Sequence, residues 1–421
     1  MGINKNELIK YLKDNLLITE AKIMKNRYLR LVFIVIAFTS FQHASFAQAS
    51  TAPIAKTFRV GIFAPLYLDS VFSLEGKFKY KGIPHFISPA VDFINGAELA
   101  LDSLRTDTSK IEAYIYDTKS YISPVDKLIN ARKLDKLDLI IGSVKDQEYK
   151  QLAAFALKRN IPFISATYPN DGGITANPFL VVVNSTLKAH CEAIYSFVLQ
   201  NHGTDKVFLV RKKGFQEDKV AEYFNMINKP DGKPLLNIET INVDNTITAD
   251  ILAKKLDSNY QCIIIGGSLD ENFAKDLTTA CYELSEHYTT TLVGMPNWDG
   301  FKSLTKKDAF ENFPIYFTTP YYNDKTDDFS RTVTDGYATK YKGIAGDMVF
   351  KGFECTYLFT KLLIAHPYDF MSQLNDPNYK VFSNYNFRPV MSNKVDSIPD
   401  YFENKHLYFI RIINGGVSKA W

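Results

Sequence analysis

Cysteine is scarce in this sequence, and its spacing does not match the common metal and redox motifs. There are four cysteines among 421 residues, and no two form a Cys-x-x-Cys pair. A zinc site or a thioredoxin-like redox site is therefore not supported. We interpret Cys191, Cys262, Cys281 and Cys355 as buried free thiols. A Cys262–Cys281 disulfide is the alternative, because an exported chain would meet an oxidising compartment.

Catalytic signatures are missing as well. The sequence contains no Gly-x-Ser-x-Gly nucleophile elbow and no His-Glu-x-x-His zinc motif. Its seven histidines are scattered without metal-ligand spacing. We therefore predict that the protein is not an enzyme, and we assign it no catalytic residue, no metal ligand and no cofactor.

A charge excess of one sign is absent from the body of the chain. The formal net charge is +3, but residues 1–47 hold seven of the 49 Lys/Arg and only three of the 46 Asp/Glu, which leaves 42 against 43 elsewhere. A body this neutral has no bulk attraction for nucleic acid, so we predict no nucleic-acid partner. The hydrophobic share of 46% is ordinary for a globular protein.

The apolar run of residues 31–41 is too short for a membrane span. Eleven residues rise only about 16 Å as a helix, against a hydrocarbon core of about 30 Å. The run follows a basic segment at 25–30 and precedes Ser45-Phe46-Ala47. This order predicts a secretory signal peptide cleaved after Ala47, with translation starting at Met24. No cysteine follows the run, so we predict no lipid anchor and a periplasmic or secreted protein.

Strand and helix patterns alternate through the rest of the chain, without a Gly/Ser-rich linker. Continuous apolar segments predict strands at 59–66, 112–118, 137–143, 161–167, 206–211, 262–267, 290–295, 315–320 and 406–415. Strands that are apolar throughout and separated by amphipathic helices indicate parallel sheets buried on both faces. The sequence therefore predicts an α/β fold with two doubly wound lobes and a cleft between them.

Ligands of such sheets bind beyond the carboxyl ends of the strands, which gives a set of candidate residues. In the first lobe and at its boundary these are Asp117, Thr118, Gly142, Ser143, Ala166, Thr167, Tyr168, Thr319, Tyr321 and Tyr322, and in the second Gly214, Phe215, Gly267, Ser268, Asn297 and Trp298. Trp298 and the tyrosines would form aromatic walls for a ligand, with lobe packing as the alternative. The Gly-Gly-Ser turn at Ser268 resembles a phosphate-binding turn.

Six segments in order resemble the type I periplasmic binding proteins. They are RVGIFAPL (59–66), INGAELALDSL (94–104), YIYDTKS (114–120), LIIGSV (139–144), IPFISAT (161–167) and FKGFECTYLFTKLL (350–363). That family includes the leucine/isoleucine/valine-binding proteins and related amino-acid or amide receptors of ABC importers. The resemblance covers about residues 57–421.

The resemblance implies two Rossmann-like lobes joined by three hinge crossovers. We expect the crossovers near 184–187, near 319–322 and after the helix ending near 365, so that the N-lobe comprises 57–184 and 321–370 and the C-lobe 185–320 and 371–421. It also implies a small polar ligand and a membrane permease as partners. The alternative is a protein-interaction module on the same fold, acting in the cell envelope or in regulation of peptidoglycan synthesis.

For the ligand's polar end, the family uses hydroxyls and backbone amides, and Ser143 and Thr167 match in type. The chain departs from the family at Lys145-Asp146, where small hydroxyl residues are usual. Asp146 is suited to cap the next helix and would repel an anion. We predict a ligand site formed by Ser143, Ala166, Thr167, Tyr168, Phe215, Ser268, Trp298 and Tyr322.

Overall fold

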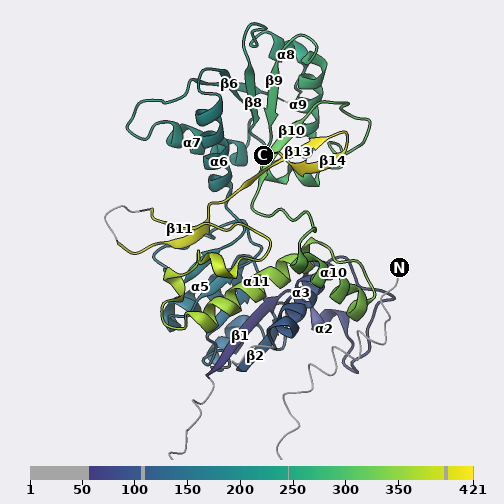
Figure 1. The fold of residues 1–421 in the computed structure, drawn as a ribbon, viewed down its shortest axis with the longest axis vertical. Coiled ribbons are helices and arrows are strands. Elements are labelled where there is room, and N and C mark those ends of the chain that lie inside the picture. Colours follow the sequence, from purple (N-terminus) through teal and green to yellow (C-terminus); the bar gives the residue numbers. More distant parts are fainter. Residues whose placement is uncertain (1–55, 106–109, 245, 393–396, 421) are drawn as a thin grey trace, which may run out of the picture.

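The computed structural model describes residues 56–105, 110–244, 246–392 and 397–420. The predicted signal peptide, the cleavage after Ala47 and the start at Met24 lie outside these residues. Within them, every helix is too short or too polar to cross a bilayer. Two lobes, one above the other in Figure 1, are joined by irregular segments of the chain.

Each lobe is built on one sheet, with seven strands among the described residues. The N-lobe sheet has the spatial order β11-β12-β5-β4-β3-β1-β2. Its strands are β1 (Thr57–Ala64), β2 (Lys110–Asp117), β3 (Leu139–Gly142), β4 (Phe163–Ser165), β5 (Leu180–Val182), β11 (Phe387–Val390) and β12 (Tyr401–Asn404). All neighbours are parallel except β11 and β12.

The C-lobe sheet repeats this plan in the order β14-β13-β10-β9-β8-β6-β7. Its strands are β6 (Lys206–Lys212), β7 (Ile238–Val243), β8 (Cys262–Gly266), β9 (Thr290–Val293), β10 (Ile315–Thr319), β13 (Tyr408–Ile413) and β14 (Gly416–Lys419). Strand β13 is antiparallel to both β10 and β14, and the other pairs are parallel. The prediction of two mostly parallel α/β lobes is confirmed.

Helices pack on both faces of each sheet. The N-lobe helices are α2 (Leu68–Val71), α3 (Ser88–Leu104), α4 (Val125–Asn130), α5 (Asp146–Arg159), α10 (Asp328–Tyr341), α11 (Asp347–Ala365), η3 (Phe370–Ser372) and η4 (Pro377–Tyr379). The C-lobe helices are α6 (Leu187–Asn201), α7 (Phe215–Asn228), α8 (Ala249–Ala253), α9 (Glu271–Leu284) and η2 (Pro296–Gly300). Separate apolar cores therefore fill the two lobes.

Two glycines allow α3 and α11 to cross in close contact. A Cβ atom on Gly96 would lie 1.9 Å from the Val349 carbonyl oxygen, and one on Gly352 would lie 2.0 Å from that of Phe93. Any side chain at either position would force the helices apart. The crossing brings the early helix of the N-lobe against the helix that returns after the C-lobe.

The lobe boundaries follow from sheet membership and differ in one place from the expected division. Residues 371–421 were expected in the C-lobe, whereas β11 and β12 belong to the N-lobe sheet, because β12 pairs with β5. The third crossing therefore falls at 405–407, between β12 and β13. The first two crossings run between β5 and α6 and between β10 and α10.

The four cysteines are all buried and free, so the alternative Cys262–Cys281 disulfide is not formed. Cys262 lies in β8 and Cys281 in α9, where both contribute to the apolar core of the C-lobe. These thiols act as small apolar side chains.

Candidate functional site

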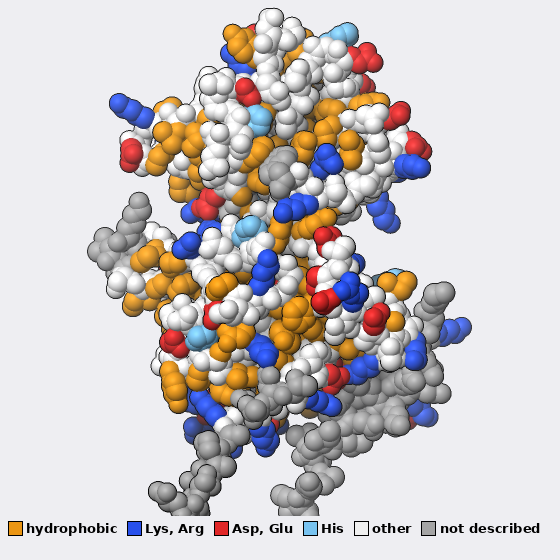
Figure 2. All heavy atoms as spheres, viewed as in Figure 1, with side chains coloured by type: hydrophobic (Ala, Val, Ile, Leu, Met, Phe, Trp, Pro, Cys, Tyr) orange, Lys and Arg blue, Asp and Glu red, His pale blue; other side chains and the backbone are white. Residues whose placement is uncertain are grey.

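The topology directs one edge of each sheet toward the other lobe. The three crossings leave the carboxyl ends of β5, β10 and β12. Because the other central strands run parallel to these, their carboxyl ends lie at the same edges. The loops after β3 and β4 in the N-lobe, and after β6, β8 and β9 in the C-lobe, therefore face the space between the lobes. Figure 2 shows the surface narrowing between the lobes.

A pair of hydroxyls marks the N-lobe edge. The Oγ atom of Ser143, directly after β3, lies 3.1 Å from Oγ1 of Thr167, just beyond β4. The Ser143 N–H donates to the Phe63 carbonyl at 2.9 Å. The Nδ2 group of Asn184 donates to the Thr167 carbonyl at 2.7 Å. The two predicted hydroxyl residues thus come together, held by β1 and by the first crossing.

The amino end of α5 lies beside this pair and carries no side-chain cap. Helix α5 begins at Asp146, and its N-cap residue is Lys145, whose side chain accepts no hydrogen bond. The predicted role of Asp146 as the cap is therefore wrong. Asp146 instead has a left-handed backbone, with φ of 55°. The first N–H groups of α5 remain open to a polar ligand.

Lys119 is a charged residue of this edge that the sequence analysis did not select. It follows β2, and its Nζ atom lies 2.6 Å from Oε1 of Glu148 in the first turn of α5. Burial disfavours the charged form of Lys119, but the Glu148 carboxylate outweighs this and raises the pKa of the ammonium group. Sequence offered one signal, its place just after a strand end. The pairing with Glu148 depends on the order of β2, β1 and β3.

The predicted Ala166 and Tyr168 flank Thr167 in different ways. Ala166 is buried, and its N–H donates to the Gly142 carbonyl at 2.9 Å. Tyr168 is half-buried, with its ring centroid 5.1 Å from that of Tyr149 in an edge-to-face contact. Tyr168 therefore keeps part of its ring available next to the hydroxyl pair.

The predicted Ser268 is satisfied inside the C-lobe. Its hydroxyl donates to Oε1 of Glu217 at 2.5 Å and accepts from the Asp270 N–H at 3.2 Å. Its exposed fraction is 1%. The hydroxyl is thus used to join the start of α7 to the start of α9, and the turn offers no free phosphate-binding side chain.

Trp298, predicted as an aromatic wall, lies in the C-lobe core. Its exposed fraction is 0%, and its indole N–H donates to the Ser268 carbonyl at 3.0 Å. A Cβ atom on Gly294 would lie 2.2 Å from the indole, so the ring fills the space that this glycine leaves. Lobe packing, the alternative interpretation, describes Trp298 correctly.

Phe215 and Tyr322 remain at the surface that faces the crossings. Phe215 opens α7 and is 72% exposed, with the Lys219 ammonium 4.6 Å from its ring centroid. Tyr322, in the second crossing, is half-buried, and its ring centroid lies 6.1 Å from that of Tyr408 beyond the third crossing. Both rings could contact a ligand held between the lobes.

Asp117, a candidate by its place at the end of β2, organises the neighbouring loop. Its carboxylate accepts hydrogen bonds from the N–H groups of Leu66, Tyr67 and Leu68 at 2.7–3.0 Å. Tyr67 has a left-handed backbone, with φ of 52°. The carboxylate therefore fixes the turn after β1 and is not free for a ligand.

Metal-binding groups are not found among the described residues. His190, the histidine of α6, lies in the core with Nδ1 2.8 Å from Oγ1 of Thr318. Burial lowers its pKa to about 3, so the ring is neutral. In the described ranges, no group of three or more His, Cys, Asp or Glu side chains is placed to hold a metal ion.

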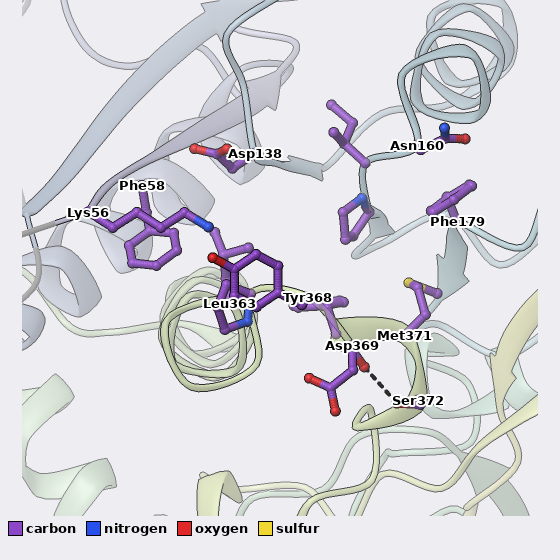
Figure 3. Close-up of a pocket in the computed structure, with 14 residues that line it drawn as sticks. Lys56, Phe58, Asp138, Asn160, Phe179, Leu363, Tyr368, Asp369, Met371 and Ser372 are labelled. Carbon is purple, nitrogen blue, oxygen red and sulfur yellow. Dashed lines mark hydrogen bonds between the residues drawn. The ribbon is translucent and has the colours of Figure 1, made fainter.

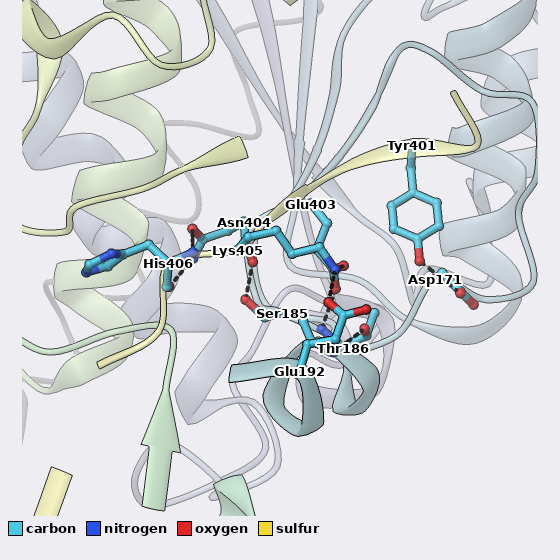
Figure 4. A network of polar contacts seen from close by, with 10 residues as sticks. Asp171, Ser185, Thr186, Glu192, Tyr401, Glu403, Asn404, Lys405 and His406 are labelled. Atoms are coloured by element: carbon cyan, nitrogen blue, oxygen red, sulfur yellow. Dashed lines mark hydrogen bonds and ion pairs between the residues drawn. The ribbon is translucent and has the colours of Figure 1, made fainter. Parts of the chain in front are cut away.

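A polar network joins the first and third crossings (Figure 4). Ser185 Oγ donates to the Asn404 carbonyl at 2.6 Å, and the Thr186 N–H donates to Oε1 of Glu403 at 2.8 Å. The Lys405 ammonium lies 2.6 Å from Glu403 and 2.8 Å from Glu192 of α6. Burial acts against the charge on Lys405, but the two carboxylates outweigh it and raise its pKa. These contacts couple the two crossings.

A cavity of about 450 Å³ lies away from this region (Figure 3). It is bounded by the start of β1, the end of α5 and the segment after α11, including Phe58, Asn160 and Tyr368. The Lys56 ammonium lies 5.0 Å from the Phe58 ring centroid and 4.9 Å from that of Tyr368. This cavity is at the amino ends of the N-lobe strands, opposite the edge that faces the C-lobe.

Comparison with known proteins identifies the fold. The periplasmic binding protein family matches residues 88–365. A putative branched-chain amino acid ABC transporter protein from Rhodospirillum rubrum is 14% identical, with a TM-score of 0.62 over 87% of this chain and 100% of that one. A periplasmic ligand-binding protein of a branched-chain amino acid ABC transporter from Burkholderia xenovorans is 12% identical, with a TM-score of 0.56 over 86% of this chain and 94% of that one.

A third solved structure is an ABC transporter substrate-binding protein from Desulfitobacterium hafniense in complex with Leu. It is 11% identical, with a TM-score of 0.52 over 87% of this chain and 100% of that one. No protein with a curated description matches the sequence. Identities this low show the shared fold. The family match spans more than half of the chain, so the protein belongs to the periplasmic binding protein family.

Proposed function

We propose that the protein is an exported solute-binding protein that captures a small polar molecule, such as an amino acid or an amide, between its lobes for an ABC-type importer. The observation that carries this proposal is the Ser143–Thr167 hydroxyl pair beside the uncapped start of α5, on the edge that faces the C-lobe. Hydroxyls and free N–H groups suit the polar end of such a ligand.

The rest of the site would act on the remainder of the ligand. Tyr168 on the N-lobe, Phe215 on the C-lobe and Tyr322 in the second crossing offer ring surface around the hydroxyl pair. Lys119 and Glu148 add a charge pair at the rim. Closure of the lobes about the three crossings would then enclose the ligand.

The charges of α5 favour a second candidate, a protein-interaction module of the cell envelope. Asp146 and Glu148 occupy the first turn of α5, where they oppose an incoming carboxylate. If this repulsion prevents capture of an amino acid, the same two lobes would serve to present a surface to another protein.

A thermal-shift screen separates the two candidates. The exported protein is tested against amino acids, amides, short peptides, sugars and cell-wall fragments. A ligand at 100 times its dissociation constant stabilises the folded state by about 2.7 kcal/mol, which gives a clear shift. A shift with one chemical class supports solute capture. No shift in the whole panel, with a cooperative melting transition, would contradict it and favour the interaction module.

A further inference from the structure

The segment between β1 and α3, together with the loop after β2, exposes an unusual set of apolar side chains. Leu74 is fully exposed, and the exposed fractions of Tyr121, Ile122 and Phe86 are 73%, 72% and 51%. Tyr80 adds a further exposed ring. We call this set, with Lys77, Lys79 and Lys81, the hairpin surface. Figure 1 shows α2 and the purple loops around it on the flank of the N-lobe.

The hairpin surface is built on a fixed backbone. Phe72 and Phe78 form an antiparallel bridge, and the Ser73 N–H donates to the Lys77 carbonyl at 2.8 Å. The turn between them includes Gly76, with φ of 72°. Phe78 is buried in a small core cluster with Val71 and Ile87, separate from the main cores. Leu74 is therefore held outward at the tip of a short hairpin.

Asp69 fixes the second loop beside the hairpin. Its Oδ2 atom accepts hydrogen bonds from the Ser120 hydroxyl at 2.8 Å, the Tyr121 N–H at 2.7 Å and the Ile122 N–H at 3.2 Å. The Ser70 hydroxyl also lies 3.4 Å from the Tyr121 hydroxyl. The side chains of Tyr121 and Ile122 thus lie next to α2 and remain exposed without packing against the lobe.

Positive charge alternates with the rings along the hairpin. Lys77, Lys79 and Lys81 are exposed and flank Phe78 and Tyr80. Lys77 lies 3.5 Å from Glu75, but both side chains are more than 70% exposed, so this pair neutralises little. The Lys79 ammonium donates to the Ser70 carbonyl at 2.9 Å and remains at the surface.

We propose that the hairpin surface is a peripheral docking site for an anionic phospholipid bilayer. Leu74 and Ile122 would enter the boundary between head groups and acyl chains, and Tyr80, Phe86 and Tyr121 would lie at the level of the head groups. The three lysines complement the negative lipid phosphates. Exposed aliphatic tips favour acyl chains over an acidic polysaccharide, which would be bound mainly by stacking on flat rings. The proposal does not depend on solute capture.

Vesicle co-sedimentation tests the proposal. The exported protein is mixed with phosphatidylcholine vesicles that contain or lack phosphatidylglycerol, at low and at high salt. We expect sedimentation with the anionic vesicles, weakened by salt because the charges are exposed. Lys77→Gln/Lys79→Gln/Lys81→Gln should reduce partitioning at least about tenfold, since each lysine near an anionic surface contributes about fivefold. Leu74→Ser/Ile122→Ser should reduce it at both salt concentrations.

The matched control removes the same charge from the C-lobe, as Lys302→Gln/Lys306→Gln/Lys307→Gln, at exposed positions. All variants carry the same N-terminus, so any contribution of that end of the chain is equal among them. Unchanged melting temperatures show that the variants are folded. The proposal is overturned if the protein does not sediment with anionic vesicles, or if the C-lobe control loses as much binding as the hairpin variant. Binding to an insoluble acidic polysaccharide and not to vesicles would also overturn it.

Discussion

Residues at the ends of strands differ in whether their side chains remain available to a ligand, and their hydrogen bonds explain the difference. Ser143 and Thr167 contact each other and the backbone, yet both remain partly exposed at the edge that faces the C-lobe. Ser268 has the same position in its own lobe, but its hydroxyl is used by Glu217. A place after a strand end therefore makes a residue a candidate, and its remaining hydrogen-bonding capacity decides whether it can serve a ligand.

The hydroxyl pair gives the first prediction. With a ligand identified by the thermal-shift screen, Ser143→Ala/Thr167→Ala should raise the dissociation constant by about 100-fold or more, because each buried hydrogen bond to a charged group contributes about 1.5–3 kcal/mol. Isothermal titration calorimetry measures the change. Thr279→Ala, which removes a hydroxyl of α9 that donates to the Lys275 carbonyl of the same helix, is the control. Equal affinities for the double variant and wild type would remove the pair from the site.

Trp298 gives a prediction about stability. Trp298→Ala should lower the free energy of unfolding by about 3–5 kcal/mol, because it empties a large space in the C-lobe core. Phe215→Ala removes an aromatic ring from the same lobe at an exposed position and should change stability by less than about 0.5 kcal/mol. Urea unfolding followed by circular dichroism compares the two. Similar small losses would show that Trp298 does not support the core.

Whole elements show how far the sequence could lead. Strands β3 and β8 are buried along their full length, so their continuous apolar runs were recognisable. Strand β7 is at a sheet edge with partly alternating burial, so it gives no continuous apolar run. Strand β5 lies within the apolar run 179–183, but it has only three residues and was not among the predicted strands. Strand β12 pairs with β5, which lies more than 200 residues earlier in the chain, and local sequence patterns cannot predict such a distant pairing.

The same reasoning separates the predictable from the unpredictable part of the site. Ser143 and Thr167 follow well-marked strands, so their meeting follows from parallel order. The burial of Trp298 depends on Gly266 and Gly294 leaving room beneath the ring, which is a property of the folded lobe. The pairing of Lys119 with Glu148 likewise joins two elements that are separated by a full strand in the sequence.

The contact between α6 and β10 predicts a dependence of stability on pH. Burial lowers the pKa of His190 from 6.5 to about 3, so the folded state binds a proton less readily than the unfolded chain. Below pH 6.5 the imidazole gains a proton in the unfolded chain but not in the folded protein. The free energy of unfolding is therefore highest, as far as His190 is concerned, above pH 6.5, and it falls as the pH drops from 6.5 toward 3. His190→Gln, which does not titrate, should show a weaker loss of unfolding free energy over this range.

Urea titrations at several pH values between 7 and about 4 measure this difference, since the other titrating groups are common to both proteins. His85→Gln, at an exposed position of the N-lobe, is the control, and its curve should follow that of wild type. Parallel curves for His190→Gln and wild type would show that His190 titrates normally in the folded protein.

At the scale of the whole molecule, the three crossings determine how the lobes can move. The first and third crossings are joined by Ser185, Thr186, Glu403 and Lys405, so they should move together. The second crossing passes separately from β10 to α10. Closure by rotation about these segments would keep the Glu403–Lys405 pair intact, because both residues belong to the coupled part.

The last prediction concerns this coupling. The Glu403 side chain is 1% exposed, so Lys405→Met would leave a buried carboxylate without its cation and lower the free energy of unfolding by about 3 kcal/mol. Glu403→Gln/Lys405→Met removes both charges and should recover much of that loss. Lys255→Met breaks the exposed pair with Glu239 and should cost less than about 1 kcal/mol. Urea unfolding of wild type, Glu403→Gln, Lys405→Met and the double variant gives the coupling energy. If the double variant loses as much unfolding free energy as the two single variants lose together, Glu403 and Lys405 stabilise the crossings independently.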